Sequence, residues 1–182
     1  TPLGVDDLTI NDMRIRATQT ADDPLSTVDA AASARAVAVA INAATPSTGV
    51  QATVGSTTRA LTVLNFGALA GNALTVNGVP ITGAITDAAS LVSAVNAAQI
   101  PGVFASSSAA NNLTLTAADG RNIALATDGS AASGINFLGL NPSGGAAAST
   151  TTTGVVTLSS ANAFTLNGLN PSNAGLRSGP VN

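Results

Sequence analysis

The chain has 182 residues, of which 45% are hydrophobic, and its six arginines and nine aspartates give a net charge of −3, since lysine, glutamate, histidine and cysteine are absent. The absence of cysteine and histidine excludes disulfides, thiolate chemistry and ordinary zinc sites, and the lack of a basic run argues against nucleic acid as a partner. No apolar run approaches the roughly 20 residues needed to cross a bilayer, so no membrane span is expected.

Two short hairpins of nearly the same sequence are predicted. The first is Leu8-Thr-Ile-Asn-Asp-Met-Arg-Ile15, and the second is Leu74-Thr-Val-Asn-Gly-Val-Pro-Ile81. Apolar residues alternate on both sides of a central dipeptide, Asn11-Asp12 or Asn77-Gly78. These residue types tolerate the positive φ angles of a tight type I′ turn. Hairpins with such short arms need a helix or further strands behind them for stability.

An alanine-rich helix is predicted after each hairpin. The first helix is expected from Asp29 to Ala44, with a cap within Ser26–Asp29, and the second opens at Asp87 and is shorter. The two helices end in the same pattern, Ile41-Asn-Ala-Ala44 and Val95-Asn-Ala-Ala98. One structural unit has therefore been used twice in this chain.

Strand-like runs follow the helices, and the strand after each helix begins with Gly-Val-x-Ala. The predicted runs are 50–54, 60–66, 103–107, 112–116, 122–127 and 155–159. Residues 129–154 are rich in Gly, Ser, Ala and Thr, and we interpret them as a linker or loop. A third echo of the hairpin arm, Phe164-Thr-Leu-Asn-Gly168, has no helix behind it.

No catalytic, cofactor-binding or metal-binding residue is predicted. Asp6-Asp7, Asp22-Asp23 and Asp29 form a loose acidic group without the spacing of a calcium-binding loop. Roles in turns and helix caps are favoured for them, and a calcium site split between segments stays open as the alternative. The serines have no histidine, lysine or cysteine to serve as a base, so the chain is not expected to be an enzyme or to need a cofactor.

The four phenylalanines, Phe66, Phe104, Phe137 and Phe164, are the only aromatic residues. All four lie in apolar, strand-like contexts, and we expect all of them to be mostly buried. A glycan-binding site would need such rings to be exposed as a platform.

The repeated order of Leu-Thr-(Ile/Val)-Asn-(Gly/Asp), a helix ending in (Ile/Val)-Asn-Ala-Ala, and Gly-Val-x-Ala resembles the flagellin hook IN motif. This motif occurs in the variable central regions of bacterial flagellins and hook-associated proteins. The resemblance covers about residues 8–128, with a weaker echo at 155–177, and Asp12 departs from the expected glycine. It carries over no catalytic or ligand-binding residue.

The resemblance implies an extracellular domain on the outer surface of the bacterial flagellum, outside the core that polymerises. Its partners would be the rest of the parent flagellin subunit and neighbouring filament subunits, and the fragment alone would be monomeric. The expected function is structural, as a solvent-exposed variable domain that contributes to the surface properties and antigenicity of the filament. The alternative is a hook-associated or adhesin-like surface module that recognises glycan or a neighbouring subunit.

The predicted fold class is α+β, with short antiparallel strands and hairpins, one amphipathic helix packed on each repeat, and an elongated body of two subdomains. Residues 1–66 and 146–182 would form an inner domain with the first repeat. Residues 67–145 would form an inserted outer domain with the second repeat. A simple tandem arrangement is the alternative.

Overall fold

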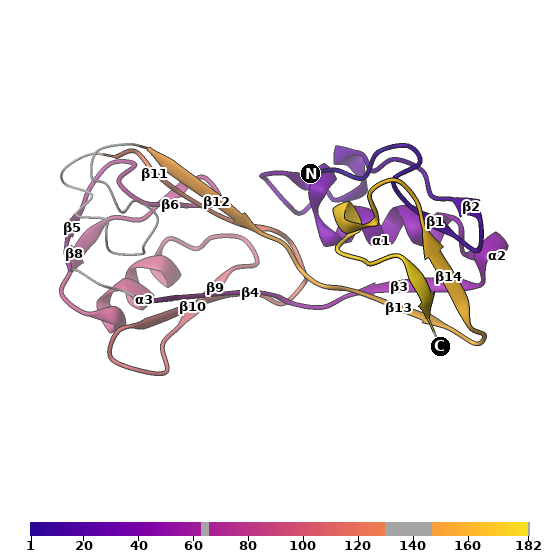
Figure 1. Cartoon of the computed structure of the whole chain (residues 1–182). Coiled ribbons are helices and arrows are strands. Elements are labelled where there is room, and N and C mark those ends of the chain that lie inside the picture. The colour runs from indigo at the N-terminus through magenta and orange to yellow at the C-terminus, as the bar shows by residue number, and fades with distance from the viewer. Residues whose placement is uncertain (63–65, 130–146, 182) are drawn as a thin grey trace. The chain divides into compact units, whose positions relative to one another are not determined.

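The computed structural model describes residues 1–62, 66–129 and 147–181, and it shows a mixed α and β chain whose described strand pairs are all antiparallel (Figure 1). The chain forms two compact units. The first unit comprises Thr1–Ser56, Asp119–Asn122 and Thr153–Asn182, and the second comprises Thr57–Ala118 and Ile123–Thr152. The division into inner and outer domains with boundaries at 66/67 and 145/146 stays a prediction.

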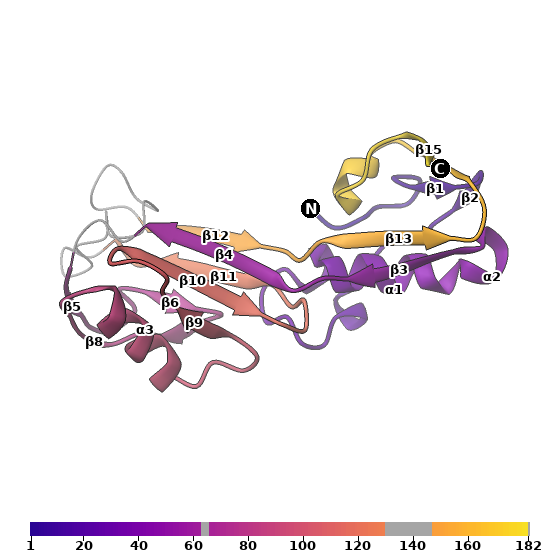
Figure 2. The ribbon, with the colours of Figure 1, turned by 90° about the horizontal axis from the view of Figure 1, so that it is seen from below.

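The first unit contains one four-stranded sheet, of order β15-β14-β1-β2, and one two-stranded sheet, β13-β3. Helix α1 lies along β3 and β13 (Figure 2). The elements of the first unit are β1 (Thr9–Ile10), β2 (Met13–Arg14), η1 (Thr20–Asp22), η2 (Ala30–Ala32), α1 (Ala34–Ala43), α2 (Thr45–Thr48), β3 (Val50–Val54), β13 (Val156–Ser160), β14 (Phe164–Asn167), η5 (Pro171–Ala174) and β15 (Gly179–Val181).

Within its described residues, the second unit contains three sheets, of order β4-β10-β9, β12-β11-β6-β7 and β5-β8, and helix α3 packs against β8, β9 and β10. The elements of the second unit are β4 (Thr57–Thr62), β5 (Gly67–Leu69), β6 (Thr75–Val76), β7 (Val79–Pro80), β8 (Gly83–Ile85), α3 (Ala88–Ala97), β9 (Phe104–Ser106), β10 (Asn112–Ala117), β11 (Ile123–Thr127) and β12 (Ala148–Thr152).

Both hairpins turn at the predicted dipeptide. The φ angles are 50° at Asn11 and 61° at Asp12, and they are 50° at Asn77 and 80° at Gly78. These positive values are those of a type I′ turn, whose twist matches the twist of the flanking strands. Across the turns, β1 pairs with β2 and β6 pairs with β7.

The first helix begins later than predicted. Asp29 has a φ of 52° and is followed by the short 3-10 helix η2, so that α1 starts only at Ala34. Its N-cap is Ser33, whose Oγ accepts a hydrogen bond of 3.0 Å from the Ala36 N–H. The predicted cap within 26–29 was wrong because the Ser26 hydroxyl instead donates to the nearby Asp23 carboxylate and accepts from the distant Asn122 N–H.

The second helix opens at Asp87, as predicted. Asp87 Oδ1 accepts a hydrogen bond of 2.7 Å from the Ser90 N–H, and Ser90 Oγ accepts one of 3.1 Å from the Asp87 N–H. This reciprocal capping box satisfies two backbone donors that have no partner within the helix. Because α1 and α3 both have 10 residues, the expectation of a shorter second helix was wrong.

The threonine-rich segment is not simply a loop. Thr150–Thr152 lie in β12, which pairs with β11 along its whole length. Threonine is β-branched and favours extended backbone, and this propensity outweighs the low-complexity composition. The loop interpretation of 129–154 was therefore wrong for β12, and its residues 130–146, with Phe137, lie outside the described residues.

Each unit has a hydrophobic core of its own, and the two copies of the repeat contribute the same positions to it. Leucine, isoleucine and valine side chains of the hairpin and of one helix face are almost completely buried. The equivalent buried residues are Leu8, Ile10, Ile15, Val37 and Ile41 in the first copy and Leu74, Val76, Ile81, Leu91 and Val95 in the second.

Candidate functional site

The asparagine near the end of each repeat helix bonds to the backbone of the strand that follows. Asn42 Nδ2 donates to the Ala52 carbonyl at 2.9 Å, and Asn42 Oδ1 accepts from the Ala52 N–H at 2.8 Å. Asn96 makes the same two bonds to Ala105, at 3.0 and 2.8 Å. A carboxamide has both a donor and an acceptor, so it can satisfy a backbone N–H and C=O together.

These two asparagines act at strand edges. β3 pairs on one side with β13, and β9 pairs on one side with β10. In an antiparallel ladder, alternate residues direct their N–H and C=O toward the partner strand or away from it. Asn42 and Asn96 bind the groups that point away, so they attach the helix to the strand and satisfy part of its outer edge.

The asparagine of each hairpin turn also bonds to a strand that is distant in sequence. The Asn11 N–H donates to the Thr165 carbonyl at 3.0 Å, and Asn11 Oδ1 accepts from the Thr165 N–H at 3.0 Å. Asn77 forms the equivalent bonds with Ala124, at 2.8 and 2.7 Å. The side-chain oxygen thus extends the ladder at the turn, where the backbone alone would end it.

The acidic group singled out in the sequence is dispersed over separate contacts. Asp22 accepts hydrogen bonds from Arg16 at 2.7 and 2.8 Å and from the Gln19 N–H at 2.8 Å. Asp7 is held by Asn170, Asn173 and the Gly4 N–H. Within the described residues, no group of three or more His, Cys, Asp or Glu side chains could hold a metal ion. Asp22 thus serves a local pairing, whereas Asp7 joins the N-terminal segment to residues more than 160 positions away.

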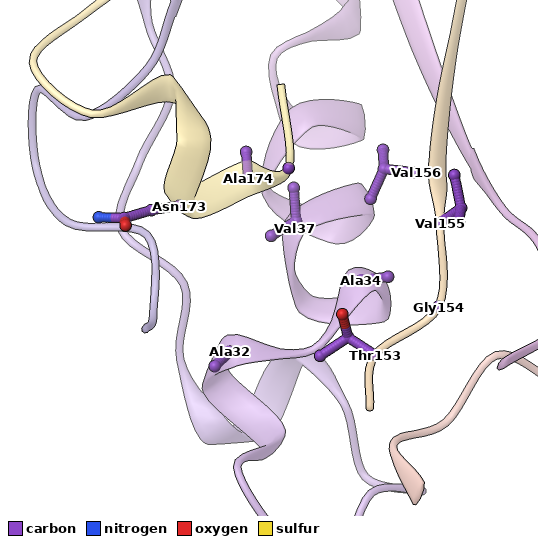
Figure 3. Close-up of a pocket in the computed structure, with 10 residues that line it drawn as sticks. Ala32, Ala34, Val37, Thr153, Gly154, Val155, Val156, Asn173 and Ala174 are labelled. Atoms are coloured by element: carbon purple, nitrogen blue, oxygen red, sulfur yellow. The ribbon is translucent and has the colours of Figure 1, made fainter. Parts of the chain in front are cut away.

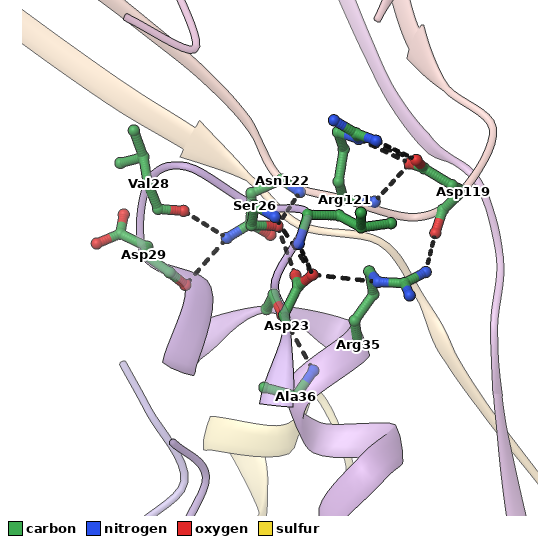
Figure 4. Close-up of polar contacts among 11 residues, drawn as sticks. Asp23, Ser26, Val28, Asp29, Arg35, Ala36, Asp119, Arg121 and Asn122 are labelled. Carbon is green, nitrogen blue, oxygen red and sulfur yellow. Dashed lines mark hydrogen bonds and ion pairs between the residues drawn. The ribbon is translucent and has the colours of Figure 1, made fainter. Parts of the chain in front are cut away.

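One polar cluster of the first unit was not foreseen from the sequence, and we call it the Asp23 cluster (Figure 4). Asp23 is 1% exposed, and its carboxylate accepts hydrogen bonds from the Leu25 N–H, the Ser26 N–H and the Ser26 hydroxyl. Arg35 Nε lies 3.1 Å from Asp23 Oδ1. The members of the Asp23 cluster are Asp23, Ser26, Arg35, Asp119, Arg121 and Asn122.

The cluster attaches the segment Asp119–Asn122 to the rest of the first unit. The Asn122 N–H donates to Ser26 Oγ at 2.8 Å, and Asn122 Nδ2 donates to the Val28 and Asp29 carbonyls, each at 3.1 Å. Arg35 Nη1 donates to the Asp119 carbonyl at 2.6 Å. These hydrogen bonds join residues more than 80 positions apart in sequence through a few polar side chains. None of these side chains is a reactive group.

The pKa values in this region follow from these contacts. Burial alone raises the pKa of Asp23, but donors from the Ser26 and Ser33 hydroxyls and from the backbone outweigh it, so that the pKa is lowered overall. The hydrogen bonds from Arg121 lower the pKa of Asp119. Both carboxylates are therefore ionised at neutral pH, and neither has the raised pKa of a general acid.

A pocket of about 160 Å³ lies in the first unit (Figure 3). Val37 of α1, Val156 of β13 and Ala174 of η5 surround it, together with backbone near Gly154 and Gly175. No charged side chain lines this pocket. Thr153 and Asn173 add polar side chains to the lining, and the small volume fits a single small side chain better than a substrate.

The phenylalanines do not behave as one group. Phe164 is 6% exposed, but Phe66 is 41% and Phe104 is 70% exposed, so the prediction that all four are buried was wrong. The repeat itself contains the signal that was missed. In Gly49-Val-Gln-Ala52 and Gly102-Val-Phe-Ala105, Phe104 takes the place of the exposed Gln51. Alternation along the strand therefore directs Phe104 outward.

No helix in the described part of the chain is both long and apolar enough to span a membrane. The sequence matches no protein-family model, and no curated protein matches it.

Proposed function

We propose that this chain is a structural, solvent-exposed variable domain of a bacterial flagellar filament protein, and that it contributes to the surface properties and antigenicity of the filament. It would lie outside the cell and contact the rest of the parent flagellin subunit and neighbouring subunits. The proposal rests on the flagellin hook IN motif that both repeats resemble.

The observation that carries the proposal is the equivalent role of Asn42 and Asn96. Each follows a buried apolar residue at the helix end, and each forms two hydrogen bonds with the strand after the helix. Both asparagines of each repeat bind backbone, and the apolar residues of the pattern fill a core. The shared residues thus serve architecture, as expected of a domain that occupies space on a surface.

The test uses the source bacterium. Antibodies raised against the isolated chain should decorate intact flagellar filaments in electron micrographs. A parent protein from which these 182 residues are deleted should still form filaments, and these filaments should lose the antibody label. Filaments that never bind the antibody, or a label confined to another structure of the cell surface, would overturn the proposal.

The exposure of Phe104 and Phe66 favours a second candidate function, an adhesin-like or hook-associated module that recognises glycan or a neighbouring subunit. Exposed aromatic rings can stack on the apolar face of a sugar. Binding of the chain to immobilised glycans, lost in Phe104→Ala but kept in Gln51→Ala, would support this candidate. Equal binding by both variants would count against it.

A further inference from the structure

The two edges of the β3–β13 sheet in the first unit differ in how their backbone groups are satisfied. On the β3 side, the outward groups of Ala52 bond to Asn42. The Val50 N–H donates to Thr48 Oγ1 at 3.2 Å, and the Val50 carbonyl accepts from Thr45 Oγ1 at 2.7 Å. Side chains from α1 and α2 thus close this edge along most of its length.

The β13 edge is open. Ala52 lies opposite Leu158 in the ladder, and the Gly55 N–H donates to the Val155 carbonyl at 2.9 Å. By the alternation of an antiparallel ladder, Val156, Leu158 and Ser160 direct their N–H and C=O away from β3. Among the described residues, none of these outward groups has a hydrogen-bond partner.

The β13 edge lacks two common protections of strand edges, charged side chains and proline. Both edge strands of the four-stranded sheet in the same unit have such a residue, Arg14 in β2 and Pro180 in β15, which hinders pairing with another strand. β13 has the sequence Val-Thr-Leu-Ser-Ser, without charge or proline. Alternate side chains of the strand, Val156 and Leu158, pack against the core of the first unit, while Thr157 and Ser159 are exposed.

We propose that the β13 edge is an interaction surface for the β13 edge of a second copy of this chain. In an antiparallel arrangement centred on Leu158, the outward groups of Val156 in one copy meet those of Ser160 in the other. The edge is then complementary to itself, and no like charges oppose each other across the contact. Because an edge of five residues makes a small interface, the contact forms at high local concentration and dissociates in dilute solution.

The test compares the isolated chain at low micromolar concentration and at about 1 mM, the order of effective concentration that tethered neighbours reach. Sedimentation equilibrium should show the 17.5 kDa monomer when dilute and a mass rising toward the dimer when concentrated. Amide hydrogen exchange should slow with concentration at Val156, Leu158 and Ser160. It should stay unchanged at Thr157 and Ser159, whose N–H groups face β3.

Two matched double variants identify the edge. Thr157→Lys with Ser159→Lys places lysines opposite each other across the proposed contact and should raise the dissociation constant about tenfold. Gln51→Lys with Thr53→Lys adds the same charge at the paired positions of β3, on the same face of the sheet, and should leave dimerisation nearly unchanged. Circular dichroism melts establish that both variants are folded.

A wild-type chain that stays monomeric at about 1 mM would overturn the proposal. So would dimerisation that the β3 double variant weakens as much as the β13 one. The test needs only the isolated chain, so its failure is distinguishable from failure of the proposed filament function.

Discussion

At the scale of single residues, Asn42 and Asn96 each supply with one side chain the N–H and C=O that a further strand would supply with its backbone. The advantage over a further strand is that the bond also fixes the end of the helix to the sheet. An alanine or another apolar residue in place of either asparagine could pack there, but it could not form hydrogen bonds with the outward N–H and C=O of the strand.

Replacing either asparagine by alanine should weaken the fold. Asn42→Ala or Asn96→Ala leaves the N–H and C=O of Ala52 or Ala105 to partial solvation, and each should lower the free energy of unfolding by about 1–2 kcal/mol. Urea denaturation measures the loss. The control is Asn162→Ala, because Asn162 is exposed and its side chain has no hydrogen bond within the described residues. An equal loss in the control would contradict a specific role for the repeat asparagines.

The backbone conformation of the two hairpin turns was predictable, because it depends on residues that are neighbours in sequence. The positive φ angles at Asn77 and Gly78 follow from their residue types alone. The pairing of Asn122 with Ser26 spans 96 positions, and nothing local to either residue indicates it. Phe104 could have been placed correctly, since the repeat aligns it with the polar Gln51.

At the scale of elements, the start of α1 shows where local signals compete. Ser26 and Ser33 are both acceptable N-caps by residue type. Ser33 becomes the cap because the Ser26 hydroxyl is occupied by Asp23, three positions before it, and by the Asn122 N–H, which only the tertiary fold brings close. Strand positions such as β3 were predicted well, since an alternating run bounded by glycines is a local pattern.

Helix α1 offers a direct measure of how much its apolar face contributes. Ile41 is fully buried, whereas Val39 on the same helix is 43% exposed. Ile41→Ala should lower the free energy of unfolding by about 2–4 kcal/mol, because it removes buried methyl groups and leaves a cavity. Val39→Ala should cost under about 0.5 kcal/mol. Thermal melts followed by far-UV circular dichroism measure both, and similar shifts would mean that α1 does not use this face for packing.

The turn that contains Gly120 provides a second test at this scale. Gly120 has a φ of 75°, and an added Cβ would lie 2.5 Å from Val54 Cγ1 and 2.9 Å from the Gly55 carbonyl oxygen. Gly120→Ala should therefore cost about 2–4 kcal/mol from backbone strain and overpacking.

Gly49→Ala is the matched control, because Gly49 has a φ of 72° but no atom within 4 Å of the added Cβ. It should cost about 1 kcal/mol, from the left-handed conformation alone. Urea denaturation separates the two variants. Equal losses would mean that the segment around Gly120 is not packed as described.

At the scale of the whole molecule, the two units repeat one construction but differ in charge. Of the nine aspartates, only Asp87 and Asp128 belong to the second unit, and of the six arginines only Arg59 does. The first unit thus relies on polar pairings such as the Asp23 cluster, whereas the second relies more on its apolar core and its strand ladders. The sequence shows this charge asymmetry directly, but which charges meet depends on contacts far apart in the chain.

This asymmetry predicts that acid weakens the first unit before the second. In the first unit, hydrogen bonds lower the pKa values of three aspartates, chiefly from Asn173 to Asp7, from Arg16 to Asp22 and from Arg121 to Asp119. Burial alone would raise the pKa of Asp23, but hydrogen bonds from Ser26, Ser33 and the backbone lower it overall. In the second unit, the pKa of Asp87 is lowered by the Ser90 backbone N–H. A carboxyl group whose pKa is lower in the folded state stabilises the fold fully above its unfolded pKa of about 3.9, and the contribution is lost as the pH falls through the folded value.

Stability of the first unit should therefore be level from about pH 8 to pH 5 and fall below about pH 4. Urea titrations at neutral pH and near pH 3, followed by the amide NMR signals of each unit, measure this difference. At the lower pH, signals from the first unit should disappear at clearly lower urea than those from the second. Asp23→Asn should reduce the acid sensitivity of the first unit, because it removes one of the titrating carboxylates. Parallel loss of both units at every pH would show that the carboxylate pairings do not set the acid stability of the first unit.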